Sequence, residues 1–265
     1  MPSALERHLS RYLPLTFHER DALDWLERRE RHVRAGERVL EQDGPTEALF
    51  VVESGWLHSS IRLHDGGRQI LRFYFVGELS IACNLAWATS AATLTAVSDC
   101  VLREIPRANL GRLFNEHPRL AAVLYGLAAT EQVAMNDRLA TLGRMDGQTR
   151  IATLLLELRA RLRIADGYEG PDFALPLTQQ ELGDSLGLTK AHVNRSLRAL
   201  EERGLIERAG RIIRIPHVDT LADEVGFVDR YAQMQLDWLP TTRNGSPSDM
   251  GHLEGATEVT KETPA

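Results

Sequence analysis

Amide and guanidinium side chains gather on one stripe of the segment between Thr189 and Gly204. Asn194, Arg195 and Arg198 follow Ala191 at spacings that place all four on one side of a helix. An asparagine amide can pair with two atoms of adenine at once, and an arginine guanidinium can pair in the same way with guanine. The stripe therefore predicts a helix that reads base edges in the DNA major groove, although a solvated helix face is the simpler alternative.

Two capped helices would hold this stripe in place. Thr178 and Glu181 have the spacing of a capping box at the start of a first helix. Gly187 breaks that helix, and Thr189 caps a second one that ends at Gly204. The apolar residues of the second helix that recur at i, i+4 and i+7 are Val193, Leu197 and Leu200. They are expected to pack inward, which leaves the polar stripe exposed.

The segment after Gly204, LIERAGRIIRI, alternates like two short strands around an Ala209-Gly210 turn. Such a hairpin is typical of a wing beside a helix-turn-helix. Residues 187–216 carry seven Lys or Arg against three Asp or Glu, a balance of 7 − 3 = +4 within a chain of net charge -6. This contrast predicts a confined nucleic-acid footprint. The residues expected to contact DNA are Thr178, Gln179, Thr189, Lys190, Ala191, His192, Asn194, Arg195, Arg198, Arg208 and Arg211.

Length and composition limit which class of protein this can be. A chain of 265 residues with 43% apolar content can bury a substantial core and suggests two domains. No stretch approaches the roughly 18 apolar residues of a membrane span, and no signal peptide is visible, so we expect a cytoplasmic protein. Cys83 and Cys100 are too few for a disulfide framework or a metal cluster and are expected to be buried.

The N-terminal half has an all-β pattern between Arg31 and about Ile105, with short β-branched and aromatic runs separated by glycine turns. This pattern predicts a small barrel or rolled sandwich, preceded by a helix over 16–28. A long helix over Pro118–Leu142 follows, and its stripe is a candidate dimer coiled coil; packing onto its own barrel is the alternative. The stripe residues are Leu120, Leu124, Leu127, Met135, Leu139 and Leu142.

The expected boundaries place the sensor part at 1–117, the long helix at 118–145 and the DNA-binding part at 146–216, which begins with a helix over Asp146–Arg163. An amphipathic helix is predicted over 217–239, and the polar tail 240–265 is expected to be disordered. Residues 217–265 hold nine acidic against three basic side chains, so this extension is expected to avoid DNA.

This order of parts resembles the cyclic-AMP receptor and fumarate-nitrate regulator (CRP/FNR) superfamily of bacterial transcription factors. The resemblance covers roughly residues 15–216 and rests on GEL at Gly77–Leu79, the long helix and the block TQQELGDSLGLTKAHVNRSLRALEERGLI. It implies an α+β fold, with a cyclic-nucleotide-binding-like β-roll, a dimerisation helix and a winged helix-turn-helix. It also implies a homodimer that binds a near-palindromic operator and contacts RNA polymerase.

Departures from the family pattern indicate which small molecule could regulate this protein. Members that bind cyclic nucleotides hold the phosphate with an Arg-Ser pair, and the matching positions here are Ser90 and Ala91. An unpaired buried phosphate is very costly, so cyclic AMP is not expected to gate this protein. Another small molecule is the alternative effector. The candidate pocket residues are Trp56, Phe73, Tyr74, Gly77, Glu78, Leu79, Trp87, Ser90 and Ala91. Core packing is the alternative role for the four aromatic residues, and the more typical one.

Departures from the family pattern also concern cofactors and the recognition of bases. No cysteine precedes Cys83, which excludes the N-terminal iron-sulfur cluster of the oxygen-sensing members. Haem ligation by His32, His58 or His64 stays open, although each of these is more typical of a strand edge or turn. The family commonly has Glu-x-x-(Ser or Gly)-Arg in the second helix, and Ala191 replaces the glutamate here. Loss of that carboxylate predicts an operator that differs from the family consensus.

Two other function classes are weighed against a regulator. The chain has no nucleophile elbow, phosphate-binding loop or paired metal ligands, so no enzyme is predicted. A non-transcriptional adaptor that uses the winged helix for protein contacts is the alternative. A salt-dependent shift of an operator duplex would separate a regulator from an adaptor.

Overall fold

The computed structural model describes residues 2–80, 82–167, 169–232 and 234–239. Its N-terminal half is a roll of two four-stranded antiparallel sheets, with strand orders β1-β8-β3-β6 and β2-β7-β4-β5. The strands are β1 (Arg29–Val33), β2 (Arg38–Leu40), β3 (Ala48–Ser54), β4 (Leu57–Arg62), β5 (Arg68–Tyr74), β6 (Leu79–Ser80), β7 (Thr93–Ala96) and β8 (Cys100–Pro106). Buried side chains such as Phe50, Val52 and Leu102 fill the space between the sheets, which confirms the predicted β-roll.

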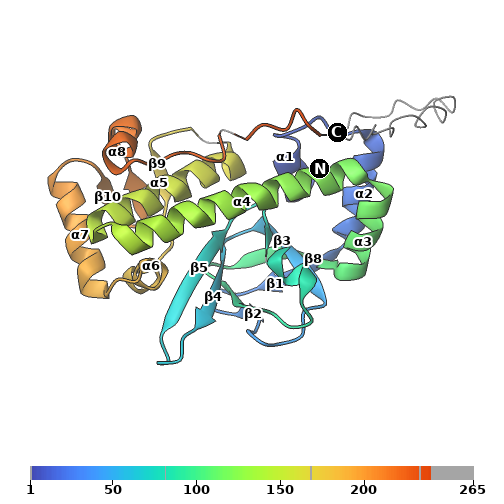
Figure 1. Cartoon of the computed structure of the whole chain (residues 1–265), viewed down its shortest axis with the longest axis horizontal. Helices are drawn as coiled ribbons and strands as arrows, with labels where there is room; N and C mark the ends of the chain where they lie inside the picture. Colours follow the sequence, from blue (N-terminus) through green and yellow to red (C-terminus); the bar gives the residue numbers. More distant parts are fainter. Residues whose placement is uncertain (1, 81, 168, 233, 240–265) are drawn as a thin grey trace, which may run out of the picture.

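Helices cover the open side of the roll (Figure 1). They are α1 (Ala4–Leu9), α2 (Phe17–Leu26) and α3 (Arg107–Glu116), and a short 3-10 turn, η1 (Ala82–Ala86), interrupts the roll. The capping box of Thr16 and Glu19 starts α2, close to the predicted helix. The sequence reasoning missed α1, which packs so closely on the roll that a Cβ atom at Gly77 would lie 2.6 Å from the Cβ of His8. Gly77 also has a φ of 85°, so glycine is required there.

The longest helix, α4 (Pro118–Arg144), runs along the whole molecule in Figure 1 and joins the roll to the C-terminal half. Pro118 occupies its first turn, where no backbone donor is needed. Leu120 and Val123 are fully buried against the helices and strands of the roll. The next helix, α5 (Gly147–Asp166), is capped by Asp146 and follows after only a short connection. The C-terminal half is therefore tied directly to the end of α4.

The C-terminal half consists of a helix pair and a small sheet. The elements are β9 (Asp172–Ala174), α6 (Gln179–Leu186), α7 (Lys190–Glu202), β10 (Glu207–Ala209), β11 (Ile212–Arg214) and α8 (Val218–Val225). The hairpin β10-β11 confirms the predicted wing, and Gly210 at its turn has a φ of 64°. Strand β9 was not predicted; it adds to β11 with Phe173 opposite Ile213.

The two halves share one hydrophobic core. Phe73 and Phe75 of the roll pack in the same cluster as Leu155 of α5 and Leu182 of α6. Polar contacts also cross this interface. Arg68 forms an ion pair of 2.7 Å with Asp184, and the Gln69 side chain donates to the backbone oxygen of Ser185. The C-terminal half is therefore docked on strand β5.

The predicted helix over 217–239 is wrong in its extent. Helix α8 ends at Val225 because Gly226 adopts a left-handed conformation, with a φ of 65°. Residues 227–232 and 234–239 return along α4 without helix or strand (Figure 1). The tail 240–265, expected to be disordered, lies outside the described residues. Among the helices of the described part, none is long and apolar enough to cross a membrane.

Candidate nucleic-acid interface and sensor cavity

Local hydrogen bonds build the helix-turn-helix as the sequence predicts. The side chain of Thr178 accepts from the backbone nitrogen of Glu181 at 3.2 Å, and the Glu181 carboxylate accepts from the Thr178 nitrogen at 2.7 Å. Thr189 caps α7 by accepting from the backbone nitrogen of His192 at 3.3 Å. These caps satisfy donors that would otherwise be unpaired at both helix starts. The recognition helix α7 therefore begins at a fixed point.

Gly183 lets the two helices approach. A Cβ atom at this position of α6 would collide with the backbone oxygen of Leu188 in the turn between the helices. Because that obstacle is backbone, it cannot move aside as a flexible side chain would. The sequence reasoning missed this residue, whose only local signal is a glycine within a helical pattern.

The polar stripe of α7 faces solvent. Val193, Leu197 and Leu200 are buried in the core, as predicted. On the other side, Ala191, Arg195 and Arg198 are exposed and Asn194 is half-buried. Thr178, Thr189, Lys190 and His192 are exposed near the helix starts, and Gln179 is half-buried. None of the predicted contact residues on these two helices is buried in the core.

The two wing arginines differ in their surroundings. Arg208 forms an ion pair with Glu201 of α7, which lowers the pKa of that carboxyl through a side-chain hydrogen bond. Arg211 is exposed beside the turn of the hairpin. Arg208 therefore braces the wing against the recognition helix, and Arg211 is the better placed of the two for a phosphate.

A cavity of about 600 Å³ lies between the roll, α1 and α4. Its walls are mainly apolar, with Leu71, Leu79 and Leu124 among them. Such a volume suits a ligand of the size that protein pockets commonly hold. Of the pocket residues expected from the sequence, Tyr74, Gly77, Glu78 and Leu79 line it.

The other expected pocket residues lie elsewhere. Phe73 is in the core, and Trp56 packs edge-on against Phe75 beside the DNA-binding half. Trp87 is 63% exposed on the surface. Ser90 is buried, where it accepts a hydrogen bond from Asn84 at 2.7 Å and donates one to the Ala92 oxygen. The sequence indicated apolar residues of the roll but not which side of each strand faces the cavity.

A buried charge network forms one end of the cavity. Arg161 of α5 reaches across to Glu78 at 2.6 Å and to the Phe73 backbone oxygen at 2.6 Å. Arg72 also contacts Glu78, at 3.4 Å, and forms an ion pair with Glu131 of α4. Burial raises the pKa of Glu78, but the Arg161 and Arg72 guanidinium groups outweigh burial and lower this pKa to about 2. The network joins the roll, α4 and α5.

Three residues that line this cavity also carry buried polar atoms without a partner in the described part of the chain. The ring nitrogen Nδ1 of His8, Nε of Arg72 and the Tyr231 hydroxyl are buried, and none has a hydrogen-bond partner within the described residues. Burial lowers the pKa of His8 to about 4, so its ring is neutral at pH 7. Burial also raises the pKa of Tyr12 to about 12. His8 and Tyr231 are therefore uncharged at pH 7 and keep unused hydrogen-bonding capacity beside the cavity.

The ionised state of Glu78 leads to a prediction for acid stability. A carboxyl whose folded pKa lies below its unfolded value stabilises the fold above the unfolded pKa and loses that contribution as the pH falls. Protonation of Glu78 should therefore lower the free energy of unfolding by on the order of 3 kcal/mol as the pH falls from about 5 to 2. Urea unfolding at several pH values checks this. The Glu78→Gln variant should lack that portion of the acid loss, and an equal loss in both proteins would contradict the prediction.

The three histidines considered as haem ligands lie on different elements of the roll. His32 is exposed and contacts Glu30 at 2.8 Å, and His64 is exposed in the turn after β4. His58 is not at a strand edge, because it is buried within β4, between β7 and β5. Burial lowers its pKa to about 4. Within the described residues, no group of three or more metal-binding side chains is present. Cys100 is buried as expected, and the side chain of Cys83 lies outside the description.

The stripe predicted for dimerisation divides between two sides of α4. Leu120 is fully buried within its own chain, which corrects its assignment to a dimer surface. Leu124 and Leu127 pack against the sensor core, and Leu142 packs against the DNA-binding half. Met135 and Leu139 are exposed, the latter by 61%. They lie on the side of α4 that the chain leaves uncovered.

Tyr125, 71% exposed, completes that side and was missed. It precedes Gln132 and Leu139 at steps of seven residues, the heptad signal that would have identified it. Ala128 and Met135 fall between them on the same exposed side. The uncovered surface of α4 therefore has the spacing of a coiled-coil seam.

Comparisons with known proteins agree with this architecture. Residues 30–117 match the cyclic nucleotide-binding domain family, and residues 149–224 match the Crp-like helix-turn-helix domain family. The chain is 30% identical over 203 residues to the transcriptional activator protein Anr of Pseudomonas aeruginosa, covering 77% of this chain and 83% of that protein. It is 25% identical over 222 residues to the fumarate and nitrate reduction regulatory protein of Escherichia coli K12, covering 83% and 88%.

A solved structure supports the same fold. FixK2 from Bradyrhizobium japonicum matches with a TM-score of 0.66 and 28% identity, over 74% of this chain and 96% of that one. Neither family match extends past residue 224, so the segment that returns along α4 lies outside both.

Proposed function

The chain belongs to the CRP/FNR family and is a DNA-binding transcription regulator of that type, and we propose that it acts as a homodimer on a near-palindromic operator. The observation that carries this proposal is the polar stripe of α7 in a winged helix-turn-helix, where Arg195 and Arg198 are exposed and Asn194 is half-buried. The proposal includes a cytoplasmic location and contact with RNA polymerase, as the family resemblance implies. Two copies of α7 would read two half-sites about one helical turn apart.

Arg195 is proposed to recognise guanine directly. Replacement by alanine should cost about 1–3 kcal/mol per half-site and relax the preference at one symmetric position. Affinities for an operator and for its single-base variants would be measured with wild type and with Arg195→Ala. Arg203→Ala is the matched control, because Arg203 lies at the end of the same helix and pairs with Glu224 of α8. Unchanged base preferences in Arg195→Ala would show that Arg195 does not read sequence.

Arg198 and Arg211 are proposed to add phosphate contacts, which strengthen binding to every sequence alike. Such contacts make the affinity fall as salt is added. The slope of log affinity against log salt concentration changes by about one unit for each phosphate contact. Arg208 is proposed to act through the wing, because Glu201 holds its guanidinium group.

The cavity beside Glu78 is proposed to take an effector other than a cyclic nucleotide. The positions that match the phosphate clamp are Ser90, whose hydroxyl bonds within its own loop, and Ala91. Glu78, moreover, is paired with Arg161. The apolar walls and the neutral His8 and Tyr231 groups suit an apolar molecule that carries hydrogen-bonding oxygen atoms.

Calorimetry with cyclic AMP and with cyclic GMP is therefore expected to show no stoichiometric binding. The double variant Ser90→Arg with Ala91→Ser is the control, since it restores the Arg-Ser pair of the family clamp while leaving Glu78 in place. Tight binding of either nucleotide by the unmodified protein would contradict this proposal.

A further inference from the structure

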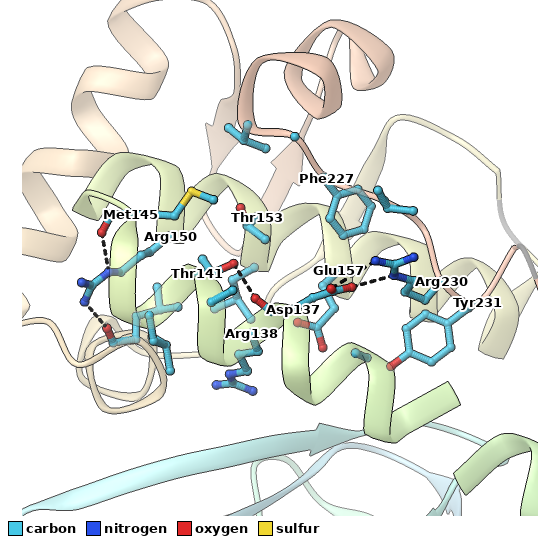
Figure 2. Close-up of a pocket in the computed structure, with 18 residues that line it drawn as sticks. Asp137, Arg138, Thr141, Met145, Arg150, Thr153, Glu157, Phe227, Arg230 and Tyr231 are labelled. Carbon is cyan, nitrogen blue, oxygen red and sulfur yellow. Dashed lines mark hydrogen bonds and ion pairs between the residues drawn. The ribbon is translucent and has the colours of Figure 1, made fainter. Parts of the chain in front are cut away.

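Residues 226–232 and 234–239, here named the strap, lie along α4 after α8 ends (Figure 1). Arg230 pairs with Asp137 of α4 at 2.7 and 3.1 Å (Figure 2). Further along, the Thr130 hydroxyl donates to the Met234 sulfur at 2.9 Å. Leu236 packs against the sensor core, and a Cβ atom at Gly126 would lie 3.1 Å from it. The strap thus contacts α4 through charge, hydrogen bonding and close packing.

The strap also holds α5. Asp229 forms an ion pair of 3.0 Å with Arg163 through one carboxylate oxygen. Its other oxygen accepts from the backbone nitrogens of Tyr231 and Ala232, at 3.1 and 3.0 Å. The Tyr231 ring lies 5.7 Å from the Arg161 guanidinium group. One carboxylate therefore sets the turn of the strap and anchors it to the DNA-binding half.

A pocket lies between α4 and α5 near their junction. A small cavity of about 180 Å³ separates them, with Thr141 of α4 and Leu154 of α5 in its walls (Figure 2). Phe227, at the start of the strap, lines the same cavity. Because the space is not filled by the two helices alone, the strap supplies part of the packing that resists a change in their angle.

We propose that the strap positions the DNA-binding half on α4, with Asp229, Arg230 and Leu236 as positioning residues, and thereby fixes the spacing of half-sites that the dimer accepts. This inference rests on the proposed dimeric regulator. If two copies of α4 meet at the dimer axis, the angle between α4 and α5 sets the distance between the two copies of α7. A released strap leaves each half-site contact intact but lets that distance vary.

Two variants of the full chain release the strap by different means. Gly126→Leu places a side chain against Leu236 and Trp238 without altering the strap. Gly111→Leu is its control, because Gly111 is also within a helix and has open space around its Cβ position. The second variant, Arg230→Asp, sets two carboxylates together, and Arg230→Asp with Asp137→Arg restores the pair in reverse order.

The test measures affinity for a single half-site and for operators whose half-site spacing differs by one or two base pairs. Hydrogen exchange of the strap is measured in parallel. Gly126→Leu is expected to raise exchange and to reduce the preference for the best spacing by about tenfold, with half-site affinity unchanged. Arg230→Asp should reduce that preference about two- to fivefold, and the reversed pair should restore it. Gly111→Leu should behave as wild type.

Wild-type spacing preference in a variant whose strap exchanges freely would overturn the inference. Continued protection of the strap in both variants would overturn it too, since the assigned contacts would then not hold the strap. Failure of wild type to bind either a half-site or an operator would instead refute the proposed function, and the two failures are therefore distinguishable.

Discussion

Replacement of Arg161 by methionine is expected to lower the free energy of unfolding by about 3 kcal/mol. Removal of one partner of a buried ion pair typically costs about 3–5 kcal/mol, because the remaining charge loses its compensation. The lower end applies here because Glu78 keeps a contact of 3.4 Å with Arg72. The variant also loses the hydrogen bond from Arg161 to the Phe73 backbone oxygen. Urea unfolding gives the change directly.

Two further variants isolate the buried charge. Arg112→Met removes an exposed pair with Glu116 at i,i+4 and should cost less than about 1 kcal/mol. Arg161→Met combined with Glu78→Leu removes both buried charges and should be more stable than Arg161→Met alone, while Arg72 keeps Glu131 as its partner. A loss for Arg161→Met no larger than that for Arg112→Met would show that the pair does not hold the two halves together.

Leu139→Glu is expected to convert the protein from dimer to monomer and to abolish tight operator binding. The Leu139 side chain is 61% exposed in the single chain and lies on the uncovered seam with Tyr125. A carboxylate buried at that seam without a partner should cost several kcal/mol per dimer interface. Because two half-sites are then no longer read together, affinity should fall to that of a single half-site.

Sedimentation at micromolar concentration measures the assembly state. Val133→Glu is the control, since Val133 is also an exposed apolar residue of α4 but lies six residues earlier, about 120° around the helix from Leu139. It should remain dimeric. A monomeric wild-type protein, or a dimeric Leu139→Glu variant, would contradict the proposed seam.

The parts of the fold that local rules determine were predictable from the sequence. Thr178, Gly187 and Thr189 set the bounds of the helix-turn-helix through hydrogen bonds between neighbouring residues. The β-branched runs between glycine turns predicted the strands of the roll, although their pairing joins distant residues such as Phe50 and Glu104. In contrast, α1 and β9 are short elements that depend on distant partners. Ser3 and Glu6 have the spacing of a helix cap, but α1 is only six residues long and packs on the roll, and β9 pairs with β11. Such elements depend on tertiary contacts that a single sequence does not display.

Residues 217–239 show why an apolar pattern alone can mislead. Leu236 and Tyr231 are apolar or aromatic because they pack on α4 and beside Arg161, not because a helix continues. Gly226 was the local signal that ends α8. The cavity was even harder to predict from the sequence, because His8, Arg72 and Arg161 come from three distant segments. Their juxtaposition follows from the docking of α1 and α5 on the roll.

The central claim is that two copies of α7 read a symmetric DNA site. Selection of wild-type protein on a fully randomised duplex library tests it most directly. The account predicts enrichment of an inverted repeat whose half-sites lie about 10 base pairs apart, centre to centre, with a guanine in each half-site. Enrichment of a single asymmetric sequence, or of no sequence at all, would contradict it.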